Sequence, residues 1–182
     1  MSGAPAVRPY PKHLEETVTL KDGDTVWLRP VRSGDEAAHA RFFDRLDPQD
    51  VYFRFFSHVH KYDLSQIERY TRIDYDREMA FIAVREDASG STETLGVVRA
   101  VTDASNLLAE YAIIVRPDLQ GKGLGRALME KVIRYCREKG TARLLGYILQ
   151  PNSAMLRMAA SLGFEIAHGS DVNVAIATLK LN

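Results

Sequence analysis

The sequence predicts an α+β fold, with a mixed, mostly antiparallel central sheet and helices on both of its faces. Two observations predict this class. Three β-prone segments between residues 79 and 115 are joined by short polar turns, which is typical of an antiparallel meander. The strand expected at 107–115 then leads through a long amphipathic segment to an apolar strand at 142–149. That order predicts one parallel pair.

The first elements are a hairpin and three short helices. Residues 17–20 and 25–29 are β-prone and flank Asp22-Gly23, a pair typical of a hairpin turn. The helices are expected to open at Ser33, Pro48 and Leu64. Residues 1–16 are rich in proline and predict a flexible tail or an interdomain linker, so the domain itself is expected over 17–182.

The remaining elements complete the sheet. The expected strands of the meander are 79–85, 95–102 and 107–115. A helix from Leu124 to about Lys139 follows, with Gly140 at its C-terminal end. After the strand at 142–149, a helix opens at Asn152 and stops at Gly163, and a final hairpin over 164–167 and 172–179 closes the sheet.

The composition excludes several classes of function. The formal net charge is zero and the isoelectric point is about 7.0, so no global positive field favours nucleic acid or an anionic membrane as a partner. Cys136 is the single cysteine, so no internal disulfide can form, and a cytoplasmic location is expected. No apolar run reaches the ~20 residues that span a bilayer.

A glycine-rich turn between strand and helix is the strongest functional signal. The strand that ends before Pro117 is followed by Gly121, Gly123 and Gly125, and helical spacing of apolar residues begins at Leu124. Glycine lets the backbone turn sharply and approach a ligand closely. Free N–H groups at a helix N-terminus bind anions, so this turn predicts a phosphate site.

Two common phosphate motifs do not fit this turn. A P-loop requires Gly-Lys-Ser/Thr, whereas Gly125 is followed by Arg126 and alanine. In a dinucleotide fingerprint starting at Gly121, Arg126 takes the place of the third glycine. The pattern that does fit is Gln-x-x-Gly-x-Gly, at Gln120, Gly123 and Gly125.

This pattern resembles the acyl-CoA pyrophosphate loop of the GNAT N-acetyltransferase superfamily, and the resemblance extends over almost the whole chain. It implies acetyl-CoA as cosubstrate and a V-shaped splay between the two central parallel strands. It also implies a β-bulge in the first of those strands, which frees backbone groups for pantetheine. The cofactor-binding residues that it implies are Ile113, Ile114, Val115, Gln120, Gly121, Lys122, Gly123, Leu124, Gly125, Arg126 and Asn152.

A closer resemblance concerns the acceptor. The segments 53–57 and 73–81 look like the acetyltransferase domain of bacterial Pat-type protein lysine acetyltransferases. Those enzymes acetylate a lysine of AMP-forming acyl-CoA synthetases, and many are fused to a domain related to ADP-forming acyl-CoA synthetases. The resemblance therefore implies a protein lysine as substrate, and either an excised domain of such a fusion or a stand-alone relative.

Acetyl transfer to an amine needs a base, because a lysine arrives protonated with a pKa near ~10.4. The resemblance places the catalytic glutamate at Glu110, at the start of the strand that feeds the phosphate loop. Glu78 is the second candidate base, and Asp76 or Glu78 is expected to attract the cationic lysine. The tyrosine that many GNAT enzymes use as general acid is replaced by Ala159.

The sequence is also compatible with two other functions. The same scaffold serves small-molecule amine acetyltransferases, and a non-catalytic acyl-CoA-sensing domain would keep the glycine loop without needing Glu110. No metal is expected, because the pair His58 and His60 has no third ligand nearby.

Overall fold

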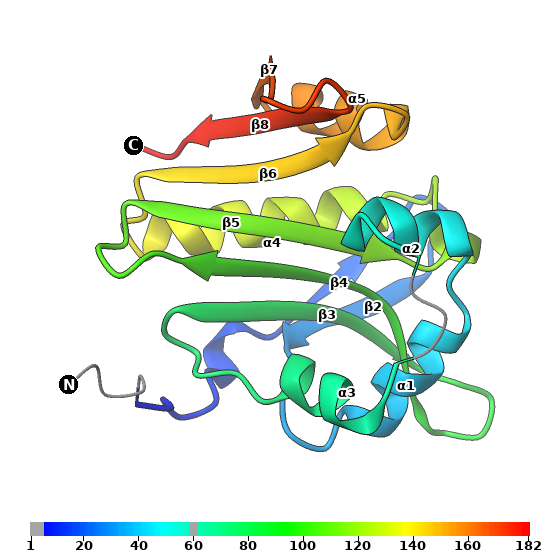
Figure 1. Cartoon of the computed structure of the whole chain (residues 1–182). Helices are drawn as coiled ribbons and strands as arrows, with labels where there is room; N and C mark the ends of the chain where they lie inside the picture. The colour runs from blue at the N-terminus through cyan, green and yellow to red at the C-terminus, as the bar shows by residue number, and fades with distance from the viewer. Residues whose placement is uncertain (1–5, 59–61) are drawn as a thin grey trace.

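The computed structural model describes residues 6–58 and 62–182 and contains one eight-stranded sheet in the order β1-β2-β3-β4-β5-β6-β8-β7 (Figure 1). The strands are β1 (Glu16–Thr19), β2 (Thr25–Pro30), β3 (Glu78–Glu86), β4 (Thr92–Thr102), β5 (Leu108–Val115), β6 (Arg143–Leu149), β7 (Glu165–His168) and β8 (Val174–Lys180). Over the described residues β5 and β6 pair in parallel, and every other pair is antiparallel. The predicted fold class is confirmed.

Helices cover both faces of the sheet (Figure 1). The helices α1 (Glu36–Asp44), α2 (Pro48–Phe55) and α3 (Leu64–Thr71) lie on one face, and α4 (Leu124–Glu138) lies on the other. Helix α5 (Ser153–Ser161) packs beside the start of α4, where Arg126 donates a hydrogen bond to Ser161 Oγ at 2.9 Å. Two short 3-10 helices, η1 (Lys12–Leu14) and η2 (Pro117–Leu119), complete the elements.

Helix α4 is held to the sheet by one apolar stripe. Leu124, Leu128, Val132 and Cys136 recur every four residues, and all four are buried. Burial of each large side chain contributes about 1.5–3 kcal/mol. Gly96 on β4 lets the helix come close, since a Cβ there would lie 3.0 Å from the Cδ1 of Leu128. The glycine loop is therefore attached to a helix that the core keeps in place.

The start of the domain differs from the expected tail. Arg8 N–H donates to the Asp74 carbonyl at 2.9 Å, and the Tyr10 ring packs edge-on against Tyr75 at 5.9 Å between centroids. The Tyr10 hydroxyl also donates to Glu15 at 2.8 Å. These contacts hold residues 8–15 against the body of the domain, so over this part of 1–16 the chain is packed rather than free.

The gap expected between the parallel strands follows from the strand pairing. β5 and β6 pair only at Leu108–Arg143, Ala109–Leu144 and Glu110–Leu145. Beyond Glu110, β5 stays with β4 as far as Val115, whereas β6 stays with β8 as far as Leu149. The two strands therefore part after Glu110, and the V opens toward the glycine loop.

The β-bulge implied for β5 is not found. The register of β5 against β4 runs without a shift from Thr102–Ala109 to Gly96–Val115. The irregularity lies instead between β3 and β4, at Ala83/Val84. That expectation was wrong, because the loss of pairing with β6 already leaves one edge of β5 unpaired, with no need for an extra residue.

Candidate active site

A cavity of about 500 Å³ lies where β5 and β6 part, bordered by α2, the glycine loop and α5. Its walls are largely apolar, with polar groups near the glycine loop and along α2, which suits a small-molecule site. The lining residues are Lys21, Gln49, Asp50, Phe53, Arg54, Tyr111, Ala112, Ile113, Ile114, Val115, Gln120, Gly121, Gly123, Gly125, Arg126, Tyr147, Ile148, Asn152, Ala154, Met155 and Met158.

The glycine loop forms one end of this cleft. Gly121 and Gly123 have φ of +78° and +92°, a backbone conformation that residues other than glycine rarely adopt. The Gln120 amide donates to Asp50 Oδ2 at 3.0 Å and to the Val115 carbonyl at 3.3 Å, which ties the loop to α2 and β5. The first N–H groups of α4 follow at once, so this end of the cleft can bind an anion.

Most of the residues expected to bind the cofactor line the cleft, and two do not. Lys122 forms an ion pair with Asp22 at 2.9 Å, and Leu124 is completely buried in the core. Asn152 lines the cleft and also caps α5, since its side chain accepts the Met155 N–H at 3.3 Å.

The backbone of β5 presents different groups to its two edges. Arg116 N–H donates to the Leu95 carbonyl at 2.9 Å, and backbone groups alternate in direction along an antiparallel ladder. The N–H and C=O of Ile114 therefore face β4, whereas those of Ile113 and Val115 face the gap. Of the three residues expected to pair with pantetheine, two offer backbone groups to the cleft and Ile114 does not.

Glu110 lies at the apex of the V. It is the last residue of β5 that pairs with β6, and its side chain is exposed on the face that carries α1–α3. Arg54 of α2 is nearby. Burial lowers the pKa of Arg54, and the charge of Glu110 acts against that shift. A carboxylate here is accessible to an acceptor that approaches from the α1–α3 face.

The two other acidic candidates are occupied elsewhere. Glu78 accepts hydrogen bonds from Arg69 at 2.9 Å and from the buried Arg99, so both of its carboxylate oxygens are hydrogen-bonded to arginines. It shares the face of Glu110, two strands away. Asp76 forms an ion pair with Arg8 at 2.9 Å and lies near Lys139, at the C-terminal end of α4. The structure does not bring Asp76 to the cleft.

Helix α2 contributes to the cleft Asp50, which was not predicted from the sequence, together with Phe53 and Arg54 of the segment 53–57. Asp50, Phe53 and Arg54 stand at positions i, i+3 and i+4 and therefore share one face of the helix. Burial raises the pKa of Asp50. This spacing was a detectable signal, but which face of α2 meets the sheet depends on the tertiary packing. Tyr111 and Tyr147 are two further cleft residues that were not predicted as part of the site.

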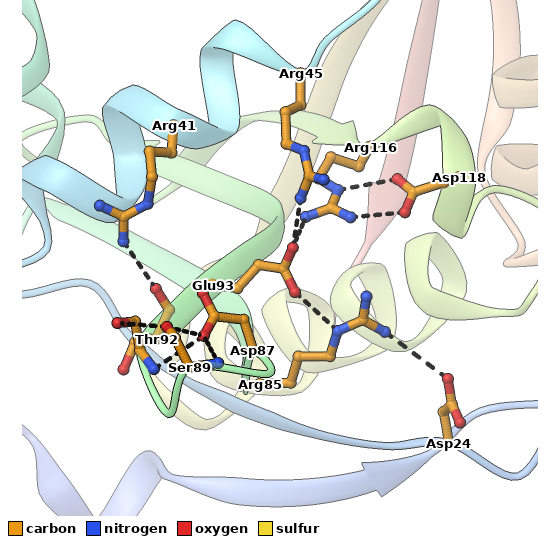
Figure 2. A network of polar contacts seen from close by, with 11 residues as sticks. Asp24, Arg41, Arg45, Arg85, Asp87, Ser89, Thr92, Glu93, Arg116 and Asp118 are labelled. Carbon is orange, nitrogen blue, oxygen red and sulfur yellow. Dashed lines mark hydrogen bonds and ion pairs between the residues drawn. The ribbon is translucent and has the colours of Figure 1, made fainter.

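A network of charges anchors the chain just before the glycine loop (Figure 2). Glu93 accepts hydrogen bonds from Arg45 at 2.6 Å, from Arg85 at 3.0 Å and from Arg116, and Arg116 also pairs with Asp118 at 2.6 Å. Although burial opposes it, the hydrogen bonds from Arg116 and Arg85 lower the pKa of Glu93. The network joins α1, β3, β4 and η2, so ion pairs from several elements fix the segment that connects β5 to the glycine loop.

Other kinds of site are not indicated. Across residues 6–58 and 62–182 no three His, Cys, Asp or Glu side chains are grouped so as to hold a metal ion; His60 of the His58/His60 pair is outside these residues. Burial raises the pKa of the Cys136 thiol to about 12, which leaves it a poor nucleophile. Of the helices in the described part of the chain, none is both long and apolar enough to cross a membrane.

Comparison with known proteins agrees with this geometry. The family model described as "Acetyltransferase (GNAT) family" matches residues 23–164. The chain is 31% identical over 147 residues to the acetyltransferase PA5475 of Pseudomonas aeruginosa, a match that covers 80% of this chain and 78% of that protein. It is 29% identical over 147 residues to the acetyltransferase Pat of Mycolicibacterium smegmatis, again over 80% of this chain.

Among solved structures, the GNAT domain of S. lividans PAT is similar over 95% of this chain and 100% of that domain, with a TM-score of 0.86 and 25% identity. The chain spans only 43% of the length of the M. smegmatis Pat protein. The similarity to that protein therefore concerns less than half of its length.

Proposed function

This chain belongs to the acetyltransferase (GNAT) family, and from that premise we propose that it acetylates the side-chain amine of a protein lysine. It is an acetyltransferase that takes the acetyl group from acetyl-CoA. The acceptor that we propose is an AMP-forming acyl-CoA synthetase. The similarity to the M. smegmatis Pat and to the S. lividans PAT domain supports a protein acceptor.

The position of Glu110 is the observation that carries the proposal. It stands where the pairing of β5 and β6 ends, beside the cleft and exposed on the α1–α3 face. The glycine loop lies at the opposite, wide end of the V. A cofactor with its pyrophosphate at that loop and its arm along β5 would bring its thioester toward Glu110.

In the proposed mechanism the lysine enters from the α1–α3 face. Glu110 removes a proton from its ammonium group, directly or through one water, so that the neutral amine attacks the thioester carbonyl. The nitrogen then loses its second proton to water, the C–S bond breaks, and CoA leaves as the thiolate. The oxyanion that develops accepts a hydrogen bond from a gap-facing N–H of β5, and that of Ile113 is nearer to Glu110 than that of Val115. The N-terminus of α4 and the loop amides of 120–126 hold the pyrophosphate.

The experiment is to measure thiol release from acetyl-CoA with an AMP-forming acyl-CoA synthetase as acceptor, beside a panel of small amines. We expect release with the synthetase and a gain of one acetyl group on a lysine of that protein. Glu110→Gln keeps the shape of the side chain and removes its basicity. It should lower kcat by about 10²–10⁴-fold and leave acetyl-CoA affinity unchanged.

Glu165→Gln is the matched control, because Glu165 is an exposed carboxylate on the edge strand β7. Release with small amines alone would replace the protein acceptor by a small-molecule one. Binding of acetyl-CoA with no turnover on any acceptor would favour an acyl-CoA-sensing domain. Full activity of Glu110→Gln would remove Glu110 as the base.

A further inference from the structure

The cleft borders a residue of the first hairpin that the mechanism above does not use. Lys21 lies in the turn between β1 and β2, and it lines the cleft together with residues of the glycine loop. The turn and the loop are far apart in the sequence, so no local pattern connects them. Only the tertiary structure places this lysine at the end of the cleft that suits an anion.

Two contacts fix the turn on the glycine loop. The Lys21 N–H donates to the Lys122 carbonyl at 3.0 Å, and the Asp22 carboxylate forms an ion pair with the Lys122 ammonium group at 2.9 Å. The other acid of the turn, Asp24, lies 3.8 Å from Arg85 of β3. The turn is therefore held beside the loop, and its two carboxylates face other cations.

The side chain of Lys21 runs across the N-terminus of α4. Its Cγ, Cδ and Cε lie 3.5, 3.8 and 3.6 Å from the position of a Cβ built on Gly123, the residue that caps α4. The aliphatic stem thus passes over the glycine loop and carries the ammonium group to the border of the cleft.

The two cations that the sequence assigns to the loop already have carboxylate partners. Lys122 pairs with Asp22, and Arg126 forms an ion pair with Glu130 at 2.9 Å. Lys21 has no ion pair among the residues that the structure describes. The positive end of the α4 dipole disfavours a cation at this place unless an anion lies between them. The arrangement therefore points to an anionic group supplied by a ligand.

We propose that the ammonium group of Lys21 binds a phosphate group of acetyl-CoA and completes the anion site that the loop amides begin; this rests on acetyl-CoA as the cosubstrate. The pyrophosphate and the 3′-phosphate of CoA both accept charge-assisted hydrogen bonds. Lys21, rather than Lys122, supplies the positive side chain at this end of the cleft. The first hairpin is thereby part of the cofactor site.

The test is calorimetric titration of CoA into the wild type and into Lys21→Met, which keeps an apolar stem over Gly123 and removes the charge. We expect the Kd of CoA to rise about 10-fold. Most of this difference should disappear at high salt, because a partly exposed ion pair is screened. Lys21→Arg should restore most of the affinity. Free pantetheine, which has no phosphate, should bind all three proteins equally.

A third ligand, 3′-dephospho-CoA, separates the two phosphate groups. If Lys21 binds the 3′-phosphate, Lys21→Met leaves the affinity for this ligand unchanged, and if it binds the pyrophosphate the loss is still seen. Either result supports the inference. An unchanged Kd for CoA overturns it. An equal loss of affinity for pantetheine also overturns it, because the substitution would then disturb the cleft and not a phosphate contact.

Lys180→Met is the matched control for the change in net charge. Lys180 is an exposed lysine of β8 that pairs with Arg143, at the end of β6 away from the glycine loop. This variant should leave the Kd of CoA unaltered, and an equal loss would overturn a specific contact at Lys21. Lys122→Met gives a second comparison, since a larger loss there would return the role to Lys122 and overturn the inference.

Binding is measured with no acceptor present, which separates this inference from the proposed acceptor. A protein that binds CoA through Lys21 and acetylates no lysine would contradict the proposed acceptor and support the inference. Failure of the wild-type protein to bind CoA would overturn both the cosubstrate and the inference.

Discussion

His39 is a titratable side chain on the buried face of α1, beside Phe42 and Phe43. It is 1% exposed, and its ring packs edge-on against Phe43 at 5.4 Å between centroids. Burial lowers its pKa to about 4, and Arg99 acts in the same direction, whereas Asp35 and Glu36 oppose the shift. At neutral pH the imidazole is therefore uncharged inside the fold.

This burial predicts a loss of stability in mild acid. Below pH 6.5 the unfolded chain binds a proton at His39, whereas the folded chain does not bind one until about pH 4. The unfolded state then holds more protons, so the free energy of unfolding falls as pH drops from 6.5 to 4, by up to about 3 kcal/mol. Urea unfolding of the wild type and of His39→Gln across this window is the measurement.

His39→Gln should lose most of this slope, because glutamine does not titrate. His168→Gln is the control, since His168 is an exposed histidine of β7. If the free energy of unfolding of the wild type and of His39→Gln depended on pH in the same way, the slope could not be assigned to His39.

At the scale of elements, several boundaries depend on contacts that local signals do not contain. Ser33 was expected to open the first helix, but α1 begins at Glu36 after Asp35. The Asp35 carboxylate accepts two hydrogen bonds from the buried Arg29, at 2.9 and 2.6 Å. An ion pair between β2 and the start of α1 therefore decides where this helix begins. The positions of α4 and α5 were predicted within two residues, because Gly123 and Gly140 flank α4, and Asn152 and Gly163 flank α5.

The charge network before the glycine loop gives a prediction at this scale. Glu93→Gln removes the carboxylate that faces Arg116, a guanidinium only 3% exposed. An arginine left without part of its counter-charge in a buried site should cost about 2–4 kcal/mol of unfolding free energy. Since Arg116 leads into η2 and the loop, acetyl-CoA affinity should also fall, as calorimetric titration would measure.

Glu86→Gln is the control for this change. Glu86 is an exposed carboxylate at the end of β3, near the same hairpin. If the free energy of unfolding of Glu93→Gln equals that of the wild type, the network does not stabilise this part of the fold. If stability falls while affinity is kept, the loop does not need the network.

At the scale of the molecule, the cleft divides one sheet into two parts. β1 to β5 form one part, β6 to β8 the other, and three residue pairs join β5 to β6. The unpaired edge of β5 lies in this cleft, where backbone groups can be satisfied by a ligand. Binding of the cofactor should therefore join the two parts and stabilise the whole fold.

The expected result is a thermal midpoint that rises with acetyl-CoA concentration. A ligand that binds only the folded state adds about 2.7 kcal/mol at 100 times its Kd, or roughly 5–10 °C for a chain of this size. Differential scanning fluorimetry is the measurement. Free pantetheine, which lacks the pyrophosphate, should give a much smaller shift, and an equal shift would argue against an anion site at the glycine loop.

The sequence by itself determined the class of fold, the order of the elements and the glycine loop between β5 and α4. These are local properties, because hydrophobic periodicity, turn residues and three glycines before a helix act within a few residues. The resemblance predicts Glu110 as the base, which stays a prediction; the structure places this residue at the end of the β5–β6 pairing.

Only the tertiary structure decided which groups meet in the cleft. Contacts between distant segments decide which face of α2 borders the cleft. They also place Asp76 near the end of α4, away from the cleft, and pair Glu78 with arginines. The unpartnered hydroxyl of Tyr111 is of the same kind. In the sequence Tyr111 is an aromatic residue of a strand, and only the packing of Gly146 and Phe164 around its ring buries the hydroxyl without a hydrogen-bond partner among the described residues.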